Sequence, residues 1–336
     1  MLSGILVVIK YKRMEELMLQ QDQSRFEQDI IGVALAAGKG SRMMNLPSKL
    51  PKPVLPVLDK PIVYHQLEAM AALGISKAII VVGHRGYEVV RQIERQPPVG
   101  IEIDYVPQEV SLGIAHCVGC LESALDRPFL LFLGDIYFHA PKLEGIIKTF
   151  RETKADAVLG AIEEEDPKAI SRNYCIVTDE NGLARQVIEK PRYPKSNLKG
   201  VGIYLFTPVV FDAIRRTSRT AMRDEYEITE SIQILIDLGY DVRCCTDIIH
   251  DLNVTFPRDL LDLNLWALEH EGLEKYVAET AQIGSGAVLE KSVVGAGAII
   301  GAGAVVRKSV IFPGGRVPGD CVLENVIVTE SEVCRV

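Results

Sequence analysis

The sequence lacks the features typical of nucleic-acid-binding, disulfide-stabilised and zinc-binding proteins. Acidic residues outnumber basic ones by 45 to 37, which gives a formal net charge of −8. Non-specific nucleic-acid binding depends on a basic surface that displaces counterions, so we expect no nucleic-acid partner. The seven cysteines follow no regular pattern, which favours a reducing cytoplasm. Cys117 and Cys120 form a C-x-x-C pair, but no second pair or histidine cluster completes a zinc site.

Apolar runs long enough to cross a membrane are also absent. The apolar stretch at residues 2–9 is too short to span a bilayer, and its charged residues follow it, the reverse of a secretory signal. We therefore expect no membrane association. Residues 1–30 are interpreted as an N-terminal extension, with Met14 as an alternative start. The 336 residues, 48% of them hydrophobic, suffice for about two folded domains.

Strand-like and helix-like patterns alternate from Ile31 onward. Apolar runs predict strands at 78–82, 101–106, 129–133 and 157–162, and helical patterns at 61–73 and 114–125 lie between them. This alternation predicts βαβ units and a Rossmann-like, mostly parallel α/β sheet over residues 31–262. In such sheets ligands bind at the carboxyl ends of the strands.

The first predicted strand runs directly into a glycine-rich turn, G-V-A-L-A-A-G-K-G-S-R over residues 32–42. Glycines allow backbone N–H groups to approach a polyphosphate, and Arg42 and the nearby Lys52 supply positive charge. A Walker A loop needs Ser or Thr after Gly-Lys, but a glycine follows Lys39. The dinucleotide fingerprint needs a third glycine where Met43 stands. An ordinary turn with incidental basic residues is the alternative.

Polar residues follow other predicted strands at the same edge of the sheet. Gln108 precedes Gly113, and its amide can both donate to and accept from a pyrimidine, although an exposed loop glutamine is the alternative. Asp135 follows the strand at 129–133, where a carboxylate is a natural Mg²⁺ ligand or simply a helix N-cap. Asp251 is a candidate second carboxylate.

A third group of motifs suits a phosphorylated sugar. Glu189 and Lys190 place a hydroxyl acceptor beside a cation, although a surface ion pair is the alternative. The glycines on either side of Val201 offer close backbone approach on a strand. The segment 224–229 opens an amphipathic helix and is expected to be structural.

A different pattern begins near residue 279. A hexapeptide that begins with an aliphatic residue and glycine is repeated at residues 283–288, 294–299 and 300–305. This predicts a parallel β-helix over residues 279–336, joined by a helical connector at 263–278. No histidine follows His270, so we expect no acyltransferase site there. The open end of a short stack favours a homo-oligomer.

The motifs G-x-G-S-R, P-K-P, Q followed by G-x-A, G-D, E-K-P, G-I-Y and E-I-T occur in this order. From residue 31 to the end, the chain resembles the sugar-1-phosphate nucleotidyltransferases, closest to glucose-1-phosphate thymidylyltransferases with an appended hexapeptide-repeat domain. The resemblance implies a left-handed β-helix. It also implies Mg²⁺-dependent transfer of a nucleotidyl group from dTTP or UTP to a sugar 1-phosphate.

The resemblance also implies roles for individual residues. Those expected to bind nucleotide are Ala36, Ala37, Gly38, Gly40, Gln108 and Gly113. Those expected to act on the phosphates in catalysis are Arg42, Lys52 and Lys190. Those expected to bind the sugar phosphate are Tyr174, Cys175, Glu189, Lys190 and Val201. Those expected to hold Mg²⁺ are Asp135 and Asp251.

Three positions depart from the family pattern. The usual Trp-x-Asp-x-Gly-x-Pro is replaced by H-D-L-N-V-T-F-P at residues 250–257, so a glycine is lost near Asp251. A usual Tyr-Gly is Tyr174-Cys175, which predicts a narrower sugar pocket. Ala37 replaces a glycine, as in uridylyltransferases that act on amino sugars. A mannose-1-phosphate guanylyltransferase and a non-catalytic nucleotide-sugar sensor are the alternatives, and the sequence leaves the sugar and the choice of UTP or dTTP open.

Overall fold

Runs of small and β-branched residues form the centre of a sheet. The structure, a computed structural model, describes residues 29–38, 50–220 and 224–336. β1 (Ile31–Ala36) lies between β4 (Lys77–Val82) and β6 (Phe129–Leu133) and pairs in parallel with both, while β5 (Glu102–Pro107) pairs in parallel with β4. Helices cover both faces of these strands, so the strands are apolar along most of their length.

β11 (Leu198–Phe206) joins the parallel strands to the rest of the sheet. It runs antiparallel to β6, to β8 (Ala157–Glu163) and to β9 (Tyr174–Thr178). β10 (Ala184–Glu189) pairs with β9, and β12 (Val242–Cys245) pairs in parallel with β8. Within the described residues the sheet has nine strands, and the predicted mostly parallel α/β architecture is confirmed.

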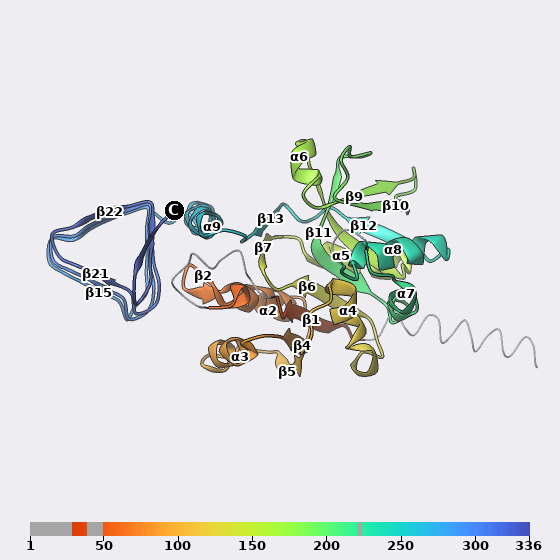
Figure 1. Ribbon diagram of the computed structural model, residues 1–336, viewed down its shortest axis with the longest axis horizontal. Coiled ribbons are helices and arrows are strands. Elements are labelled where there is room, and N and C mark those ends of the chain that lie inside the picture. Colours follow the sequence, from red (N-terminus) through yellow and green to blue (C-terminus); the bar gives the residue numbers. More distant parts are fainter. Residues whose placement is uncertain (1–28, 39–49, 221–223) are drawn as a thin grey trace, which may run out of the picture.

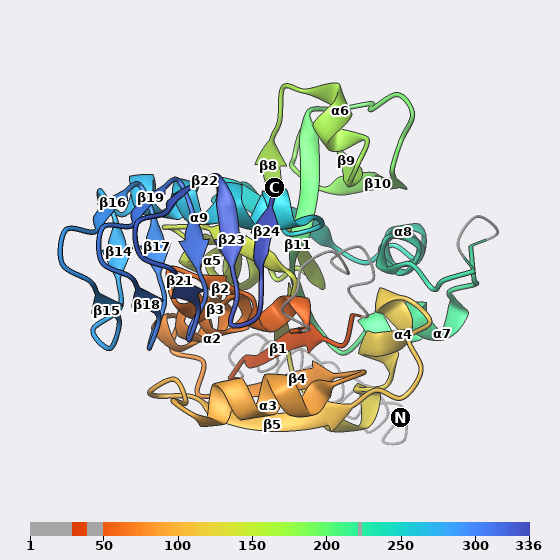
Figure 2. The ribbon, with the colours of Figure 1, turned by 60° about the vertical axis from the view of Figure 1, so that its left-hand side comes forward.

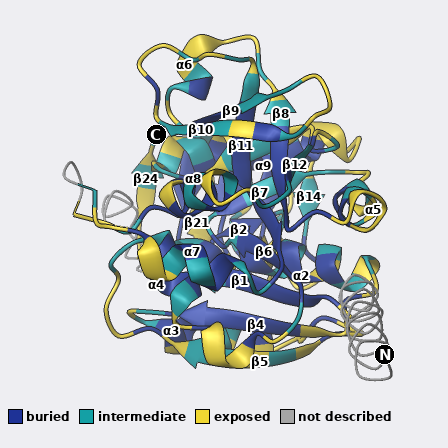
Figure 3. Cartoon of the chain, turned by 90° about the vertical axis from the view of Figure 1, so that its right-hand side faces the viewer, coloured by how far each residue is buried: buried dark blue, intermediate teal, exposed yellow. Residues whose placement is uncertain are grey.

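Two layers of helices enclose the sheet (Figure 3), whose strands are largely buried. The helices that pack on one face are α2 (Ile62–Ala72), α3 (Gly86–Glu94) and α5 (Glu144–Thr153). Those on the other face are α4 (Ile114–Gly119), α7 (Val210–Arg216) and α8 (Ile228–Asp237). Shorter elements are η2 (Lys52–Val54), β2 (Pro56–Val57), β3 (Lys60–Pro61), η3 (Glu122–Ala124) and α6 (Pro167–Ile170). The predicted helix at 114–125 is thus an α-helix that ends early, followed by a 3-10 turn.

A two-stranded ribbon leads from the sheet towards the C-terminal part. β7 (Ile136–His139) pairs antiparallel with β13 (His250–Asn253). β13 is followed by α9 (Pro257–His270), which begins where proline is well tolerated. The Asp259 carboxylate accepts hydrogen bonds from the backbone N–H groups of Thr255 and Phe256, at 2.8 and 2.7 Å. This cap fixes the angle at which the chain enters the helix.

The C-terminal residues form a parallel β-helix, triangular in cross-section (Figure 1), whose coils stack as parallel rungs (Figure 2). Its strands are β14 (Tyr276–Val277), β15 (Gln282–Ile283), β16 (Val288–Glu290), β17 (Val293–Val294), β18 (Ile299–Ile300), β19 (Val305–Arg307), β20 (Val310–Ile311), β21 (Arg316–Val317), β22 (Val322–Glu324), β23 (Val326–Val328) and β24 (Val333–Arg335). All but the last pair in parallel, and β24 turns back antiparallel on β23. The predicted β-helix is confirmed.

Each coil is one residue shorter than three hexapeptides. The register advances by 17 residues per coil, from Tyr276 to Val293, and continues with the same step to Val310 and Ile327. The shortened corner is a tight turn in which Lys291, Lys308 and Asn325 have φ values of 42°, 41° and 53°.

Two serines stabilise that corner from within. Ser292 and Ser309 are fully buried. The hydroxyl of Ser292 accepts a hydrogen bond from the N–H of Ser309, and the hydroxyl of Ser309 accepts one from Val326, both at 3.2 Å. The serines therefore link successive coils.

α9 packs between the α/β domain and the β-helix. Its apolar residues share one core cluster with residues of both, among them Leu55 and Val57 on one side and Val310 and Ile327 on the other. The Asn264 amide accepts from the N–H of Leu58 and donates to the carbonyl of Pro56, at 2.9 and 3.0 Å. No helix in the described part of the chain has the length and apolarity needed to cross a membrane.

Candidate active site

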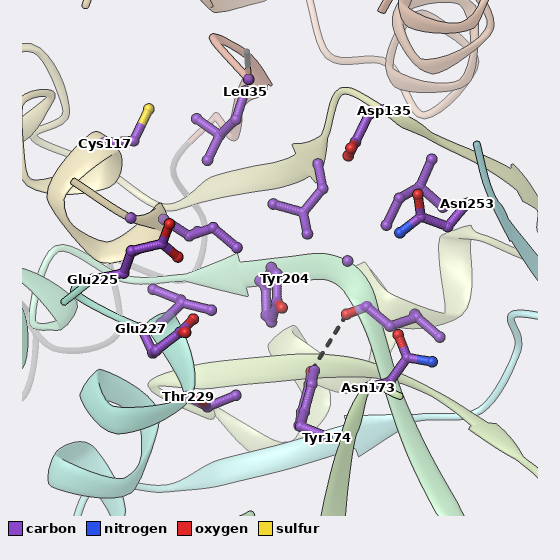
Figure 4. A pocket seen from close by; sticks show the side chains of 18 of the residues that line it. Leu35, Cys117, Asp135, Asn173, Tyr174, Tyr204, Glu225, Glu227, Thr229 and Asn253 are labelled. Atoms are coloured by element: carbon purple, nitrogen blue, oxygen red, sulfur yellow. Dashed lines mark hydrogen bonds between the residues drawn. The ribbon is translucent and has the colours of Figure 1, made fainter. Parts of the chain in front are cut away.

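A cavity of about 370 Å³ opens at the carboxyl ends of β1 and β6 (Figure 4). It lies where the topology of a parallel sheet predicts a ligand. The predicted site residues that line it are Ala37, Gly38, Lys52, Gln108, Gly113, Asp135, Tyr174, Glu189, Lys190 and Val201. Residues as far apart in the sequence as Ala37 and Val201 therefore share one site. Gly40 and Arg42 lie outside the described residues.

Two predicted residues face away from the cavity because side chains alternate along a strand. Leu35 and Ala37 line the cavity, so Ala36 between them points to the opposite face, where it joins the core cluster of Ala34. Cys175 follows Tyr174 and is fully buried, with its Sγ 3.7 Å from the carbonyl oxygen of Ser196. Neither Ala36 nor Cys175 contributes a side chain to the site, so the predicted narrowing of the sugar pocket by Cys175 is wrong.

Asp251 is likewise outside the cavity lining. Its carboxylate lies 2.8 Å from Nζ of Lys199, and both side chains are buried. Burial raises the pKa of Asp251, an effect that the Lys199 ammonium opposes. The cavity lining instead contains Asn253, two residues further along β13, beside Asp135 (Figure 4). The predicted metal role of Asp251 is therefore replaced by a buried ion pair.

Asp135 stands in the turn between β6 and β7, and a long-range clamp holds that turn. The Nε2 of Gln66, buried on α2, donates to the carbonyl oxygens of Leu133 and Ile136, at 2.9 and 2.8 Å. These carbonyls flank Asp135 on both sides. The sequence analysis missed Gln66, although a polar residue four positions after Ile62 and four before Met70 interrupts the apolar stripe of α2.

Lys52 contacts the carboxylate of Asp135. Its Nζ lies 3.4 Å from Oδ2 of Asp135, and only 12% of the Lys52 side chain is exposed. The prolines on either side of Lys52 restrict its backbone, and the carbonyl of Lys52 accepts from the N–H of Leu55 at 3.0 Å. The centre of the cavity therefore holds a fixed cation beside a partly exposed carboxylate.

One end of the cavity is lined by Gln108, Ser111 and Gly113. Gly113 has a φ of 110°, and a Cβ there would come within 2.5 Å of the carbonyl oxygen of Tyr226. The glycine is thus required for packing against the Tyr226 loop, which the sequence reading did not foresee. Cys117 also lines this end, and burial raises the pKa of its thiol to about 12.

The other end of the cavity carries Glu189 and Lys190. Thr229, in the first turn of α8, donates to Oε2 of Glu189 at 3.2 Å, and Lys190 Nζ lies 3.4 Å from Oε1. The N–H of Lys190 donates to the carbonyl of Asn173 at 2.7 Å, and Lys190 itself has a φ of 43°. Glu189 and Lys190 therefore lie in a fixed arrangement side by side.

Further residues of the cavity lining escaped the sequence analysis. Arg172 and Asn173 line the cavity from the loop after α6. The segment 224–229, expected to be structural, supplies Glu225, Glu227 and Thr229 to the wall (Figure 4). The Tyr174 ring lies directly beneath Gly200, where a Cβ would collide with it. Glycine at 200 thus makes room for Tyr174.

The donor set at the centre suits Mg²⁺ bound together with a substrate. Within the described ranges, no three His, Cys, Asp or Glu side chains lie close enough to hold a metal ion by themselves. Asp135 and Asn253 nevertheless both line the cavity, the first with a carboxylate and the second with a side-chain amide that has an oxygen to offer. Mg²⁺ is commonly held by one or two protein oxygens, with water and substrate phosphates completing its octahedron. These two residues therefore fit a magnesium ion that arrives with a triphosphate.

Comparisons with known proteins agree with the fold and the cavity. The family model described as nucleotidyl transferase matches residues 31–252, and one described as GlmU-like C-terminal hexapeptide matches residues 270–335. The chain belongs to the nucleotidyl transferase family.

Relatives carry two different nucleotides in their names. The UTP–glucose-1-phosphate uridylyltransferase AglF of Haloferax volcanii is 37% identical, over 68% of this chain and 92% of the relative. A glucose-1-phosphate thymidylyltransferase of Streptomyces griseus is 32% identical, over 79% of this chain and 78% of the relative. A crystal structure of UDP-glucose pyrophosphorylase with UDP-glucose shares the fold at 19% identity and a TM-score of 0.64, covering 72% of this chain and all of that one.

Proposed function

We propose that this chain transfers a nucleotidyl group from UTP or dTTP to a sugar 1-phosphate, producing a nucleoside diphosphate sugar and pyrophosphate. One observation carries the proposal: a cation beside a carboxylate, Lys52 and Asp135, lines the same cavity as an amide, Gln108, and as a second carboxylate and cation, Glu189 and Lys190. Gln108 lies at the end suited to a base, and Glu189 and Lys190 lie at the end suited to a sugar phosphate. Family membership and the names of the relatives support the same reaction.

The reaction needs charge neutralisation more than proton transfer. A phosphate oxygen of the sugar 1-phosphate attacks the α-phosphorus, and the bond from that phosphorus to the bridging oxygen of pyrophosphate breaks. Pyrophosphate leaves with the electron pair. The attacking phosphate is already ionised at neutral pH, so no general base is required, and repulsion between the two anions is the main obstacle. Lys52 at the transferring phosphate and Lys190 at the sugar phosphate reduce that repulsion.

The remaining parts of the site orient the two substrates. Gln108 and the backbone at Gly113 receive the base, and Glu189 accepts hydrogen bonds from sugar hydroxyls. Asp135 and Asn253 would hold Mg²⁺, which supplies positive charge to the triphosphate when bound. Arg42, outside the described residues, is proposed to bind the departing pyrophosphate.

The setting of the protein in the cell belongs to the same proposal. All seven cysteines lie in the described residues and none of them forms a disulfide, which suits the reducing cytoplasm. The β-helix ends in open rungs, so self-association is proposed through it. Glucose 1-phosphate is the first sugar to test, because the names of the relatives specify it.

The deciding experiment is a matrix of sugar 1-phosphates against the four ribonucleotides and dTTP, followed by pyrophosphate release. We expect turnover with UTP or dTTP and glucose 1-phosphate, dependent on Mg²⁺. A preference for GTP with mannose 1-phosphate would instead assign a guanylyltransferase. Tight binding of a nucleotide sugar without any exchange would assign a sensor and overturn the proposed activity.

A further inference from the structure

Gln108 is held at the base end of the cavity by one side-chain contact. Its Nε2 lies 3.3 Å from Nδ1 of His116, in the first turn of α4. The Gln108 backbone is fixed as well, because its N–H donates to the carbonyl of Val82 at 2.7 Å. Among the described residues, nothing donates a hydrogen bond to Oε1 of Gln108. That oxygen is therefore available to a ligand in the cavity, which Gln108 lines.

His116 is itself held firmly. Its ring stacks on that of Tyr226, with centroids 6.1 Å apart and planes 25° from parallel. The Tyr226 backbone accepts from the N–H of Ala115 at 3.0 Å and donates to the carbonyl of Leu112 at 2.8 Å. The Arg219 guanidinium lies over the Tyr226 ring, 5.4 Å from its centroid. The imidazole thus has a defined place relative to Gln108 and not merely a chance contact.

The chemistry of this pair gives the amide a direction. An imidazole nitrogen that carries a lone pair can accept from the Gln108 NH₂ group but cannot bond its carbonyl oxygen. With His116 protonated at Nε2, Nδ1 therefore selects the amide orientation in which Nε2 faces the histidine. The amide then presents its oxygen and its second N–H to the cavity in a fixed order.

That order distinguishes the pyrimidines. Uracil and thymine offer an N3–H donor beside a C4 carbonyl acceptor, which match an amide oxygen and an amide N–H. Cytosine offers an N3 acceptor beside an N4 amino donor, so it needs the amide turned over. Turning it over would place the Gln108 oxygen against the Nδ1 lone pair, which costs a hydrogen bond and adds repulsion.

We propose that His116 is a positioning residue that sets the orientation of the Gln108 amide, and thereby the preference for uracil or thymine over cytosine. The inference rests on the proposed function for the identity of the base end. His116 does not line the cavity, so it acts on the base only through Gln108.

The test measures base preference in variants of His116. In His116→Ala, we expect the ratio of kcat/KM for UTP or dTTP to that for CTP to fall about tenfold, the effect of one hydrogen bond. The loss should appear in KM, since the reacting phosphates are untouched. His116→Asp, which places an acceptor near the same point, should restore most of the ratio. Cys120→Ser, at the exposed end of α4, is the matched control.

A double variant separates positioning from general loosening of the loop. Once Gln108→Ala has removed the amide, adding His116→Ala should not change the base ratio further. An unchanged ratio in His116→Ala would overturn the proposal, as would equal losses in His116→Ala and His116→Asp.

Calorimetric titration with UDP and CDP provides a readout that needs no turnover. A preference for UDP that falls about tenfold in His116→Ala supports the inference even if the transfer assay fails, and an unchanged preference overturns it. Failure of the proposed function is recognised separately, because wild-type protein would then show no pyrophosphate release with any pair of substrates.

Discussion

The α/β domain and the β-helix use their buried polar side chains in different ways. In the β-helix, Ser292 and Ser309 bond only to backbone groups of their own and adjoining coils. In the α/β domain, Gln66 bonds the turn that carries Asp135, and Thr229 bonds the side chain of Glu189. Both Asp135 and Glu189 line the cavity. The two serines therefore stabilise the fold, whereas Gln66 and Thr229 position groups that can contact a ligand. The hydrogen-bond partners of a buried polar side chain thus indicate whether it stabilises the fold or supports a binding site.

The largest expected effect is a loss of activity without a loss of stability, on substitution of Lys52 in the cavity. Lys52→Ala removes the cation beside Asp135, and activity should fall at least about a hundredfold, equivalent to roughly 3 kcal/mol of transition-state stabilisation. Thermal unfolding should change little, because the Asp135 carboxylate is partly exposed. Lys60→Ala, which removes a surface ion pair with Glu68, is the control. Retention of near-normal turnover in Lys52→Ala would contradict the proposed role.

The opposite result is expected in the β-helix. A Cβ at Gly301 would collide with the backbone of Pro318 and Gly319 in the next coil. Gly301→Val should therefore destabilise the protein by about 1–3 kcal/mol while leaving turnover per folded molecule unchanged below the transition. Thermal unfolding followed by circular dichroism, with activity measured on the same sample, checks this. Val322→Thr, on the outer surface, is the control. An equal loss of activity and stability would link the β-helix directly to catalysis.

A smaller effect tests the corrected metal site. Asn253→Asp places a second carboxylate beside Asp135, so Mn²⁺ should bind the nucleotide-free protein about tenfold more tightly, as a gain of about one charge–ion contact implies. Asp251→Asn should leave Mn²⁺ binding unchanged, because Asp251 bonds Lys199. Electron paramagnetic resonance titration reports free Mn²⁺ directly. If Asp251→Asn abolished binding, the original prediction for that residue would be restored.

The smallest effect concerns the cysteines of the α/β domain. Burial raises the pKa of the Cys117 and Cys244 thiols to about 12 and that of Cys245 to about 11. Below these values the thiols stay protonated, so at pH 8 they should resist alkylation although Cys117 lines the cavity. Exposed Cys120 should react first with iodoacetamide, as peptide mass spectrometry would show. Rapid labelling of Cys117 would mean that the base end opens in solution.

The sequence predicted those parts of the site that depend on local pattern. Gly38 and Asp135 each follow an apolar strand, and the carboxyl ends of parallel strands meet at one edge, so their shared place in the cavity could be predicted. The errors at Ala36 and Cys175 reflect side-chain alternation, which fixes the face of each residue once a neighbour is placed. A match to a family motif does not by itself show on which face of the strand a side chain lies.

Other features depend on pairing between distant segments. Asp251 lies opposite Phe138 in the β7–β13 ribbon, whereas Asn253 lies opposite Ile136 and so next to Asp135. Nothing local in H-D-L-N specifies that register. Gln66 and Thr229 likewise act on residues at least 40 positions away. Such contacts become visible only when the chain is folded.

The helix between the two domains also has a length that can be compared with its neighbour. In Figure 1, α9 and the β-helix are both seen along their axes, and α9 contacts the five-stranded sheet formed by β14, β17, β20, β23 and β24. Fourteen residues of helix extend about 21 Å, and the outermost of five strands spaced about 4.8 Å apart are separated by about 19 Å. The length of α9 thus matches that of the sheet it covers. A further coil of the β-helix would extend past α9 and leave its own apolar edge uncovered.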